Sequence, residues 1–418
     1  MMKRILLVAL AMFLGAGIAA AQEDIDQSLM AELKENIFRV GVNMDPYEYI
    51  PGERTAVPKG YKPFYISHYG RHGSRSNWAG RMYAAVLEKY NKAYEAGILT
   101  QEGQKARNLI AEAVRLHDNM DGRLTLLGQQ EHSQIATRMY NDYKRVFKKG
   151  SKKIFAVSSM VPRCIISMNS ATAQLRSLDP ALDIRYDTGD TFQKYVSSDH
   201  TRQMQDSISV IMDNFSRRHV PDTAGFLRKI FTDPAKGREV TGDPVELMSE
   251  TFWMGTTCPA FGLGDGLYRM FSWEDLYHYS QGISMDFYLG QCNSVEFGDI
   301  RMPRAKPLLD DIVAKADAAI ATEEYCADLR YGHDYQVLAI SSLLGLDGVA
   351  QRLDQKGCEK WHGWKYTPFA ANVQMIFYKN KKGDVLVKFL LNERETALVG
   401  MAGGPYYNWK DVKKYLGY

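Results

Sequence analysis

Short apolar runs that alternate with long amphipathic segments are the feature that most constrains the fold of this 418-residue chain. The runs 64–68, 152–159 and 183–186, a run ending at Tyr331 and a hairpin within 372–393 are typical of buried strands. Helical periodicity fills 81–96, 104–117 and 124–149, and helices begin again near Pro162 and after Asp334. This alternation predicts an α/β fold with a mainly parallel sheet flanked by helices.

Two longer segments interrupt the alternation. Segments 79–150 and 190–300 resemble insertions that cap the sheet, and the second is mostly helical. We therefore predict one domain over 22–418. Its α/β core covers about 60–190 and 300–418, and its helical cap insertion covers about 190–300.

The N-terminus has the layout of a secretory signal. Lys3 and Arg4 precede an apolar run over 5–20, and small residues over 19–21 form a cleavage pattern. We expect removal of 1–21 and export to the periplasm or the extracellular space. Since no later stretch has the ~18 uncharged apolar residues of a membrane helix, no stable membrane span is expected.

Composition excludes several classes of protein. With 45% hydrophobic and 24% charged residues the chain is globular and is neither disordered nor fibrous. Loss of 1–21 lowers the formal net charge from +3 to +1, which gives no electrostatic argument for a nucleic-acid partner. Oligomeric state is left open. Export would permit disulfides among the five cysteines, and Cys258–Cys292 is the pair we favour; no zinc spacing occurs.

Charged and basic side chains follow three of the predicted strands. In open α/β sheets, ligands bind beyond the carboxyl ends of the strands. If these strands are parallel neighbours, six side chains converge on one pocket: Arg71, His72, Arg75, Arg163, His333 and Asp334.

Three arginines crowded together repel one another unless an anion lies between them, and the guanidinium group matches phosphate oxygens in pairs. Gly70 and Gly73 would let the backbone approach a ligand and take unusual φ values. A neutral imidazole is a nucleophile for phosphorus, which suits His72, and Asp334 could protonate a leaving oxygen. Arginines stabilise phosphoryl charge without a metal, so no cofactor is expected.

Ordinary structural roles compete with these interpretations. The i, i+4 pair His68 and His72 could bind zinc on a helix, but the strand and Gly70 disfavour that geometry. His68 is better explained as a hydrogen-bonded residue at a strand end, and His117 as a helix cap. Arg163 could be a routine helix-start residue, although a cation there is unfavourable unless an anion is bound.

The residues 71–75, Arg-His-Gly-Ser-Arg, resemble the R-H-G-x-R signature of the histidine phosphatase superfamily, in its acid phosphatase and phytase branch. The resemblance spans roughly 60–395 and includes an L-T-x-x-G element at 124–128. It implies a phosphoglycerate mutase-like core and a metal-independent phosphomonoester hydrolase. In that family His72 would be phosphorylated and Asp334 would be the proton donor. Phosphate would be held by Arg71, Arg75, Arg163 and His333.

Two positions depart from the family pattern. Asn77 stands where proline is usual, and His333-Asp334-Tyr335 replaces the His-Ala-Glu of the multiple inositol polyphosphate phosphatase subgroup, to whose bacterial members the run 58–75 is otherwise similar. The substrate expected from the resemblance is an inositol polyphosphate such as phytate. A broad acid phosphatase or a glucose-1-phosphatase is the alternative, followed by a phosphoryl mutase and a non-catalytic phosphate-ester binding protein.

Overall fold

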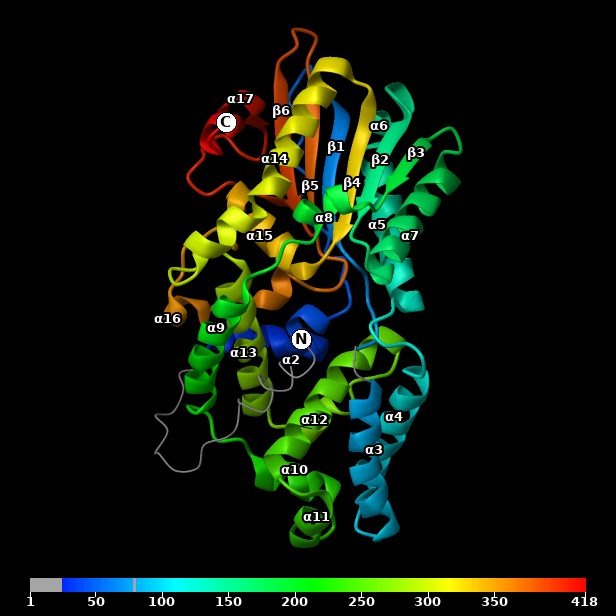
Figure 1. Cartoon of the computed structure of the whole chain (residues 1–418), viewed down its shortest axis with the longest axis vertical. Helices are drawn as coiled ribbons and strands as arrows, with labels where there is room; N and C mark the ends of the chain where they lie inside the picture. The colour runs from blue at the N-terminus through cyan, green and yellow to red at the C-terminus, as the bar shows by residue number, and fades with distance from the viewer. Residues whose placement is uncertain (1–24, 78–79) are drawn as a thin grey trace.

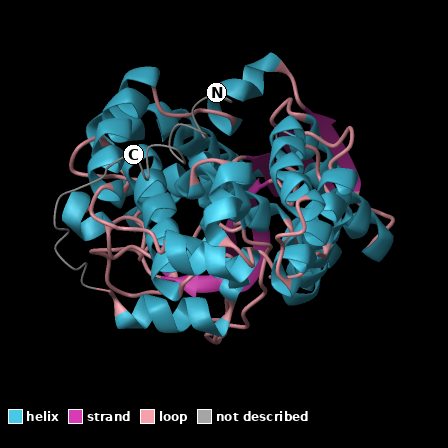
Figure 2. Ribbon diagram, turned by 90° about the horizontal axis from the view of Figure 1, so that it is seen from below, coloured by secondary structure: helices cyan, strands magenta, loops and turns pink. Residues whose placement is uncertain are grey.

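The computed structural model describes residues 25–77 and 80–418, and the predicted signal peptide at 1–21 lies outside them. An α/β unit with the sheet forms the upper half of the molecule in Figure 1, and a bundle of helices forms the lower half. Seen from the helical end, most of the sheet is hidden behind helices (Figure 2).

An eight-stranded sheet organises the α/β unit, in the order β3-β2-β4-β1-β5-β6-β7, with β8 paired to β6. Strands β3, β2, β4 and β1 are parallel, while β5, β6, β7 and β8 join antiparallel. The strand bounds are β1 Lys62–Arg71, β2 Lys153–Ser158, β3 Asp183–Asp187, β4 Tyr325–Gly332, β5 Asn372–Lys379, β6 Val385–Leu391, β7 Arg394–Thr396 and β8 Tyr407–Asn408.

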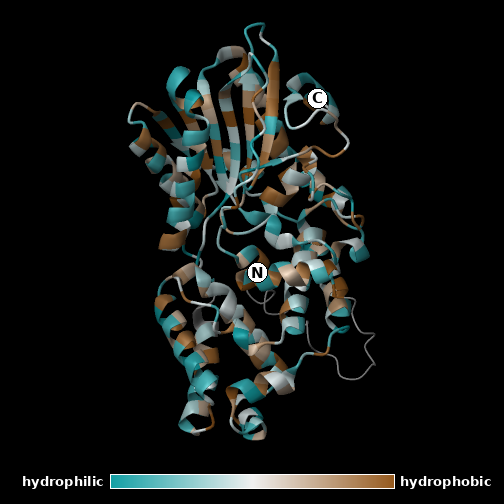
Figure 3. Cartoon of the chain, turned by 180° about the vertical axis from the view of Figure 1, so that it is seen from behind, coloured by the Kyte–Doolittle hydropathy of each residue, from teal (hydrophilic) through white to brown (hydrophobic). Residues whose placement is uncertain are grey.

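The strands are rich in hydrophobic residues (Figure 3), and helices cover both faces of the sheet because apolar side chains pack on both sides. On one face Ile66 and Ile154 pack against α5 Leu126–Asp142, α6 Lys144–Lys149 and α7 Pro162–Leu178. On the other face Tyr65 and Tyr69 meet α14, α15 and their neighbours. The helices of this second face are α8 Asp190–Val196, α9 Arg202–Ser216, α13 Trp273–Gln291, α14 Gly298–Thr322, α15 Asp334–Leu344 and α17 Trp409–Tyr415.

A separate apolar cluster holds the helical half together. It joins two segments that are distant in sequence, since α3 and α4 pack beside α10, α11 and α12 (Figure 1). Its helices include the first half of α13 together with α2 Gln27–Glu35, η1 Ile37–Met44, α3 Gly80–Glu95, α4 Gln101–Leu116, α10 Thr223–Ile230, α11 Pro234–Thr241 and α12 Pro244–Thr257. The remaining short helices are η2 Pro259–Phe261, η3 Tyr268–Met270, α16 Gln355–Cys358 and η4 Gly363–Lys365.

The predicted fold class is confirmed, and each predicted strand is present within a few residues. The helix expected over 124–149 is divided at Tyr143, and its two parts, α5 and α6, pack on the sheet instead of capping it. The domain bounds themselves stay a prediction. Over residues 25–77 and 80–418, no helix has the length and apolar character needed to cross a membrane.

The predicted disulfide is wrong. Cys258 ends α12 within the apolar cluster of the helical half, whereas Cys292 ends α13 in the cluster against the sheet. All five cysteines are buried free thiols: Cys164, Cys258, Cys292, Cys326 and Cys358. Each is a small apolar side chain in a packed interior, a common role for cysteine that sequence spacing does not reveal.

Candidate active site

The carboxyl ends of three adjacent parallel strands carry the predicted residues to one place. In the ladder, Arg71 at the end of β1 is paired with Gly332 at the end of β4, and Ser158 at the end of β2 with Tyr331. The chain leaves β2 into α7, and it leaves β4 directly into α15. The loops after β1, β2 and β4 therefore meet at one edge of the sheet, facing the helical half.

Arg71 is fully buried and contacts residues from three distant parts of the chain. Its Nη1 donates to the backbone oxygens of Asn43 at 2.5 Å and Thr367 at 2.8 Å. Its Nη2 is 2.9 Å from Oδ2 of Asp334, and its guanidinium lies over the ring of Phe369. Its Nε has no hydrogen-bond partner among the described residues. This side chain is held rigidly, and its Nε donor is unused.

His72 follows directly and is 2% exposed. Its Nδ1 lies 3.0 Å from the backbone oxygen of Gly73. Since a carbonyl oxygen only accepts, Nδ1 carries the proton and Nε2 keeps its lone pair. Burial, and then the charges of Arg163, Arg71 and Arg75, hold the pKa of His72 well below its usual value. The imidazole is therefore neutral, as a nucleophile must be.

Arg75 and Arg163 complete the positive cluster. Arg75 is 1% exposed, its guanidinium lies 5.8 Å from the centre of the Phe369 ring, and its Nη1 donates to the backbone oxygen of Ser76. Burial, followed by the charges of Arg163 and Arg71, lowers the pKa of Arg75. Arg163 follows Pro162 in the first turn of α7 and is only half-buried. The three guanidinium groups therefore converge around His72, and Arg163 is the most exposed of them.

His333 and Asp334 lie across from His72, at the start of α15. The rings of His72 and His333 are 5.8 Å apart edge to face, and Nε2 of His333 is 3.1 Å from Oγ of Ser159. Burial disfavours the charged form of Asp334, but the charge of Arg71 and a hydrogen bond from Asn43 outweigh it and lower its pKa. The Asp334 side chain is 14% exposed, against 0% for Arg71, so the carboxylate lies on the solvent side.

The loop over 73–75 is shaped by contacts with α5. Thr125, the N-cap of α5, donates from Oγ1 to the backbone oxygen of Ser74. A Cβ on Gly73 would lie 2.4 Å from the backbone oxygen of Gly128, so only glycine fits there. The expected unusual φ values are wrong, because neither Gly70, inside β1, nor Gly73 has a positive φ. Close packing explains both glycines: a Cβ on Gly70 would meet the ring of His68, and Gly73 packs against Gly128 of the L-T-x-x-G element.

Sequence reasoning missed two residues that hold this loop. The buried carboxylate of Glu131 on α5 accepts from the backbone and hydroxyl of Ser74, at 2.7 and 2.6 Å. Its Oε1 also accepts from the backbone nitrogen of Tyr47, at 2.9 Å. Glu131 could have been noticed in the sequence, because it lies one helical turn after Gly128 of the L-T-x-x-G element. For the segment around Tyr47, far upstream of the matched motifs, the sequence offered no such signal.

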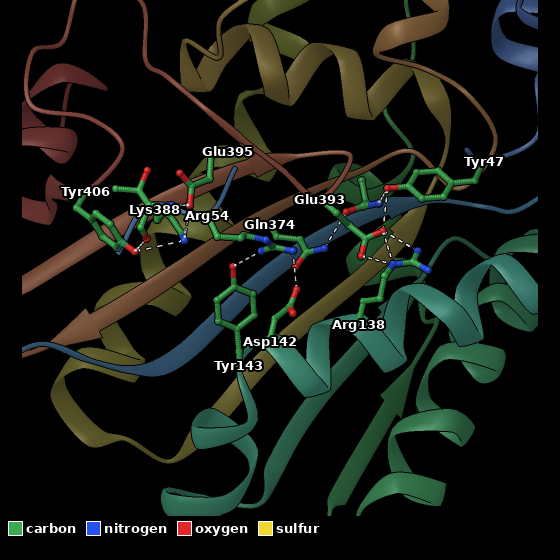
Figure 4. A network of polar contacts seen from close by, with 12 residues as sticks. Tyr47, Arg54, Arg138, Asp142, Tyr143, Gln374, Lys388, Glu393, Glu395 and Tyr406 are labelled. Atoms are coloured by element: carbon green, nitrogen blue, oxygen red, sulfur yellow. Dashed lines mark hydrogen bonds and ion pairs between the residues drawn. The ribbon is translucent and has the colours of Figure 1, made fainter. Parts of the chain in front are cut away.

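The far side of Tyr47 is anchored by a polar network (Figure 4). Its hydroxyl donates to Glu393, whose carboxylate forms a two-pronged ion pair with Arg138 on α5 at 2.7 and 2.9 Å. Glu393 has a positive φ of 64° in the turn between β6 and β7. The N-terminal segment is thus fixed to both α5 and the sheet.

Three other histidines have structural positions. His68 and His132 pack against Tyr331 on one face of the sheet, and burial lowers the pKa of each to about 3. His68 lies on a strand, so it shares no helical face with His72, and its Nδ1 lacks the hydrogen bond we expected. His117 is the C-cap of α4, as predicted, and its Nε2 accepts from the backbone of Asn77.

Comparison with solved structures identifies proteins of the same architecture. The Bifidobacterium longum multiple inositol polyphosphate phosphatase, in complex with inositol hexasulfate, is 19% identical with a TM-score of 0.69, over 90% of this chain and 97% of that one. The phytase from D. castellii is 15% identical with a TM-score of 0.67, and the match covers 96% of this chain and 89% of the phytase. The Klebsiella sp. ASR1 phytase is 13% identical with a TM-score of 0.52, and the match covers 85% of this chain and 95% of the phytase.

The chain has the fold of these phosphatases. This likeness confirms, at the level of the fold, the resemblance predicted from the Arg-His-Gly-Ser-Arg motif and the His-Asp pair. By sequence, no family model and no curated protein matches the chain. At identities this low the similarity establishes the architecture, and the roles of the individual residues rest on the geometry described above.

Proposed function

We propose that the protein is a metal-independent phosphomonoester hydrolase that works through a phosphohistidine on His72. The observation that carries the proposal is the convergence of three arginines on one neutral buried histidine, with a single ion-paired carboxylate on the solvent side. Such a cluster favours a bound tetrahedral oxyanion. A non-catalytic phosphate binder would need the arginines but neither the histidine nor the acid.

The proposed reaction has two steps. Nε2 of His72 attacks phosphorus, the bond from phosphorus to the ester oxygen breaks, and Asp334 gives its proton to the departing alkoxide. The Asp334 carboxylate then takes a proton from water, the resulting hydroxide attacks phosphorus, and the bond to His72 breaks to release inorganic phosphate. Arg71, Arg75, Arg163 and His333 hold the non-bridging oxygens throughout.

The protonation of Asp334 sets the expected pH dependence. In the free protein Arg71 keeps this carboxylate ionised, yet the first step needs it protonated. A phosphate dianion competes for Arg71 and brings negative charge close to Asp334, and both effects raise the pKa of Asp334. We therefore expect an acidic pH optimum.

The substrates that we propose are inositol polyphosphates of the phytate type. The structural neighbours include a multiple inositol polyphosphate phosphatase and two phytases. We also propose that the protein is exported, on the basis of its N-terminal sequence. A broad specificity that includes sugar phosphates is the alternative outcome of the substrate test.

The test is phosphate release at pH 4–7 with EDTA present, from phytate, glucose-1-phosphate, 2,3-bisphosphoglycerate and p-nitrophenyl phosphate. We expect turnover, with phytate preferred, and stoichiometric labelling by substrate phosphate that is acid-labile and base-stable. His72→Ala should lose both activity and label. Labelling that persists in this variant would place the nucleophile elsewhere, and phosphate binding without turnover would identify a binding protein.

A further inference from the structure

Asn43 lies in contact with both members of the Arg71–Asp334 pair, although it is 291 positions from Asp334 in the sequence. We propose that Asn43 is a positioning residue for Asp334: its amide holds the carboxyl group beside Arg71 in the orientation needed for proton donation to the leaving oxygen. This inference rests on the proposed function and adds to it a residue outside every motif found in the sequence.

The contacts of Asn43 differ between its backbone and its side chain. The side-chain Nδ2 donates to Oδ2 of Asp334 at 3.2 Å, and the backbone oxygen accepts from Nη1 of Arg71 at 2.5 Å. Oδ2 of Asp334 is also the oxygen that faces Arg71, at 2.9 Å, while Oδ1 accepts from the backbone nitrogen of Tyr335. A substitution of Asn43 thus removes one hydrogen bond from Asp334 and leaves the support of Arg71 in place.

The backbone around Asn43 is held in an unusual conformation. Val42, the preceding residue, has φ 51° and ψ −99°, which is rare for a β-branched side chain and interrupts the helical turns of η1. Backbone strain of this kind persists only where neighbouring contacts fix it. Here the contacts are strong: the oxygen of Asp45 accepts from the nitrogen of Phe369 at 2.8 Å, and Glu131 accepts from Tyr47. The segment therefore presents the Asn43 amide at one fixed place.

An amide suits a carboxyl group that changes its protonation state. Nδ2 donates to the ionised carboxylate, and after a half turn of the amide Oδ1 accepts from the protonated acid. Alanine offers neither contact, and aspartate offers only acceptors at neutral pH. The titratable or charged groups that face Asp334 are Tyr69 and Arg71 on β1, Arg75 in the following loop, Cys164 on α7, and His333 and Tyr335 beside it. Among the described residues of the N-terminal segment, Asn43 is the one whose uncharged side chain donates to Asp334.

The test compares the first-turnover rate at saturating substrate over pH 4–8, because this rate reports the ionisation of groups in the enzyme–substrate complex. The two substrates are an alkyl phosphate and p-nitrophenyl phosphate, whose phenol leaves without a proton. In Asn43→Ala the ionised carboxylate loses a donor, so for the alkyl ester we expect the alkaline limb to move up by about 0.5–1 pH unit. Ionisation of the substrate affects the wild type and the variant equally, so it cancels when their pH profiles are compared. Lost orientation should lower the alkyl rate at its optimum roughly 3- to 10-fold, with the aryl rate within about 2-fold.

Two further variants keep the test independent of folding. Asn43→Asp is nearly isosteric and places a like charge opposite Asp334, so its limb should move up at least as far. The matched control is Asn36→Ala: Asn36 lies at the start of the same segment and donates from Nδ2 to Glu48, also at 3.2 Å, outside the site. We expect this control to keep the wild-type pH profile and the wild-type ratio of alkyl to aryl rates.

The outcomes separate this inference from the proposed function. Limb shifts in both Asn43 variants with an aryl rate close to wild type support it. An unmoved limb, equal losses on both esters, or the same shift in Asn36→Ala would overturn it while hydrolysis by the wild type still supported the function. If the wild type hydrolyses neither ester, the proposed function fails and this inference fails with it.

Discussion

The Arg71–Asp334 ion pair is the residue-scale feature on which the site depends. Arg71 has no exposed side-chain surface, and two backbone oxygens and one aromatic ring fix its position. A buried pair of this kind is costly to break from one side, because the remaining charge loses its partner in a medium of low polarity. An incoming phosphate supplies a replacement for Asp334, so the carboxyl group can become an acid at the moment a substrate binds.

Asp334→Asn tests the acid role directly. An amide cannot donate a proton to an alkoxide, so kcat for an alkyl phosphate should fall by about 10²- to 10⁴-fold. An aryl phosphate with an acidic phenol needs little help in leaving, so its rate of phosphoenzyme formation should fall much less. Rapid-mixing measurement of the first turnover isolates that step. Equal losses for both esters in the first turnover would remove Asp334 from the acid role.

At the scale of elements, α5 is the support of the loop over 73–75. Its N-cap Thr125, its single glycine Gly128 and Glu131 all contact that loop, and an isolated bridge joins Arg75 to Leu124 just before the helix. A Cβ on Gly128 would lie 2.2 Å from the backbone oxygen of Ser74 and 2.8 Å from its nitrogen. No backbone can approach so closely, so any larger residue there must displace the helix or the loop.

Gly128→Ala should therefore lower activity more than its size suggests. Overpacking of this kind costs about 1–3 kcal/mol of unfolding free energy, and a displacement of about 1 Å near reacting groups can cost 10²-fold in rate. Gly264→Ala is the control, because nothing lies within 4 Å of its added Cβ. The measurements are kcat and the midpoint of urea unfolding. A fully active Gly128→Ala would mean that α5 does not determine the loop position.

The elements also show what the sequence could and could not predict. Strands followed at once by arginines and histidines, such as 64–72 and 325–334, could be read locally because parallel strands bring their carboxyl ends together. The contacts that Asn43 and Tyr47 make with the site could not be predicted. Neither residue belongs to a local motif, and their partners lie on α15 and α5. The unusual φ predicted for Gly73 was wrong, and its close approach to the backbone of Gly128 could not be predicted because only the packed helix reveals it.

At the scale of the molecule, the absence of disulfides over the described residues, which contain every cysteine, has a measurable consequence. Burial raises the pKa of Cys164 and Cys258 to about 12, so neither thiol forms a reactive thiolate near neutral pH. We expect a thiol reagent to modify no cysteine in the native protein and all five after denaturation. The thermal midpoint should not respond to reductant. A midpoint that falls with dithiothreitol would show that the protein contains a disulfide.

The buried neutral histidines should make the whole fold sensitive to acid. His68 and His132 have pKa values of about 3 in the folded protein, against about 6.5 in an unfolded chain. Between these values the unfolded state binds protons that the folded state does not, so stability is complete above pH 6.5 and is lost progressively as pH falls towards 3. At pH 4.5 each of the two lowers the unfolding free energy by about 2–3 kcal/mol.

His132→Gln should flatten this dependence, because glutamine does not titrate and its unfolded state binds no extra proton. The measurement is the difference in urea-unfolding free energy between pH 7 and pH 4.5, which cancels any constant cost of the substitution. His200→Gln is the opposite control: Asp199 raises the pKa of His200 despite its burial, so its contribution is present at low pH and is lost as pH rises. Removing His200 should steepen the fall in stability towards acid. If His132→Gln leaves the difference unchanged, protonation of this histidine does not couple to folding.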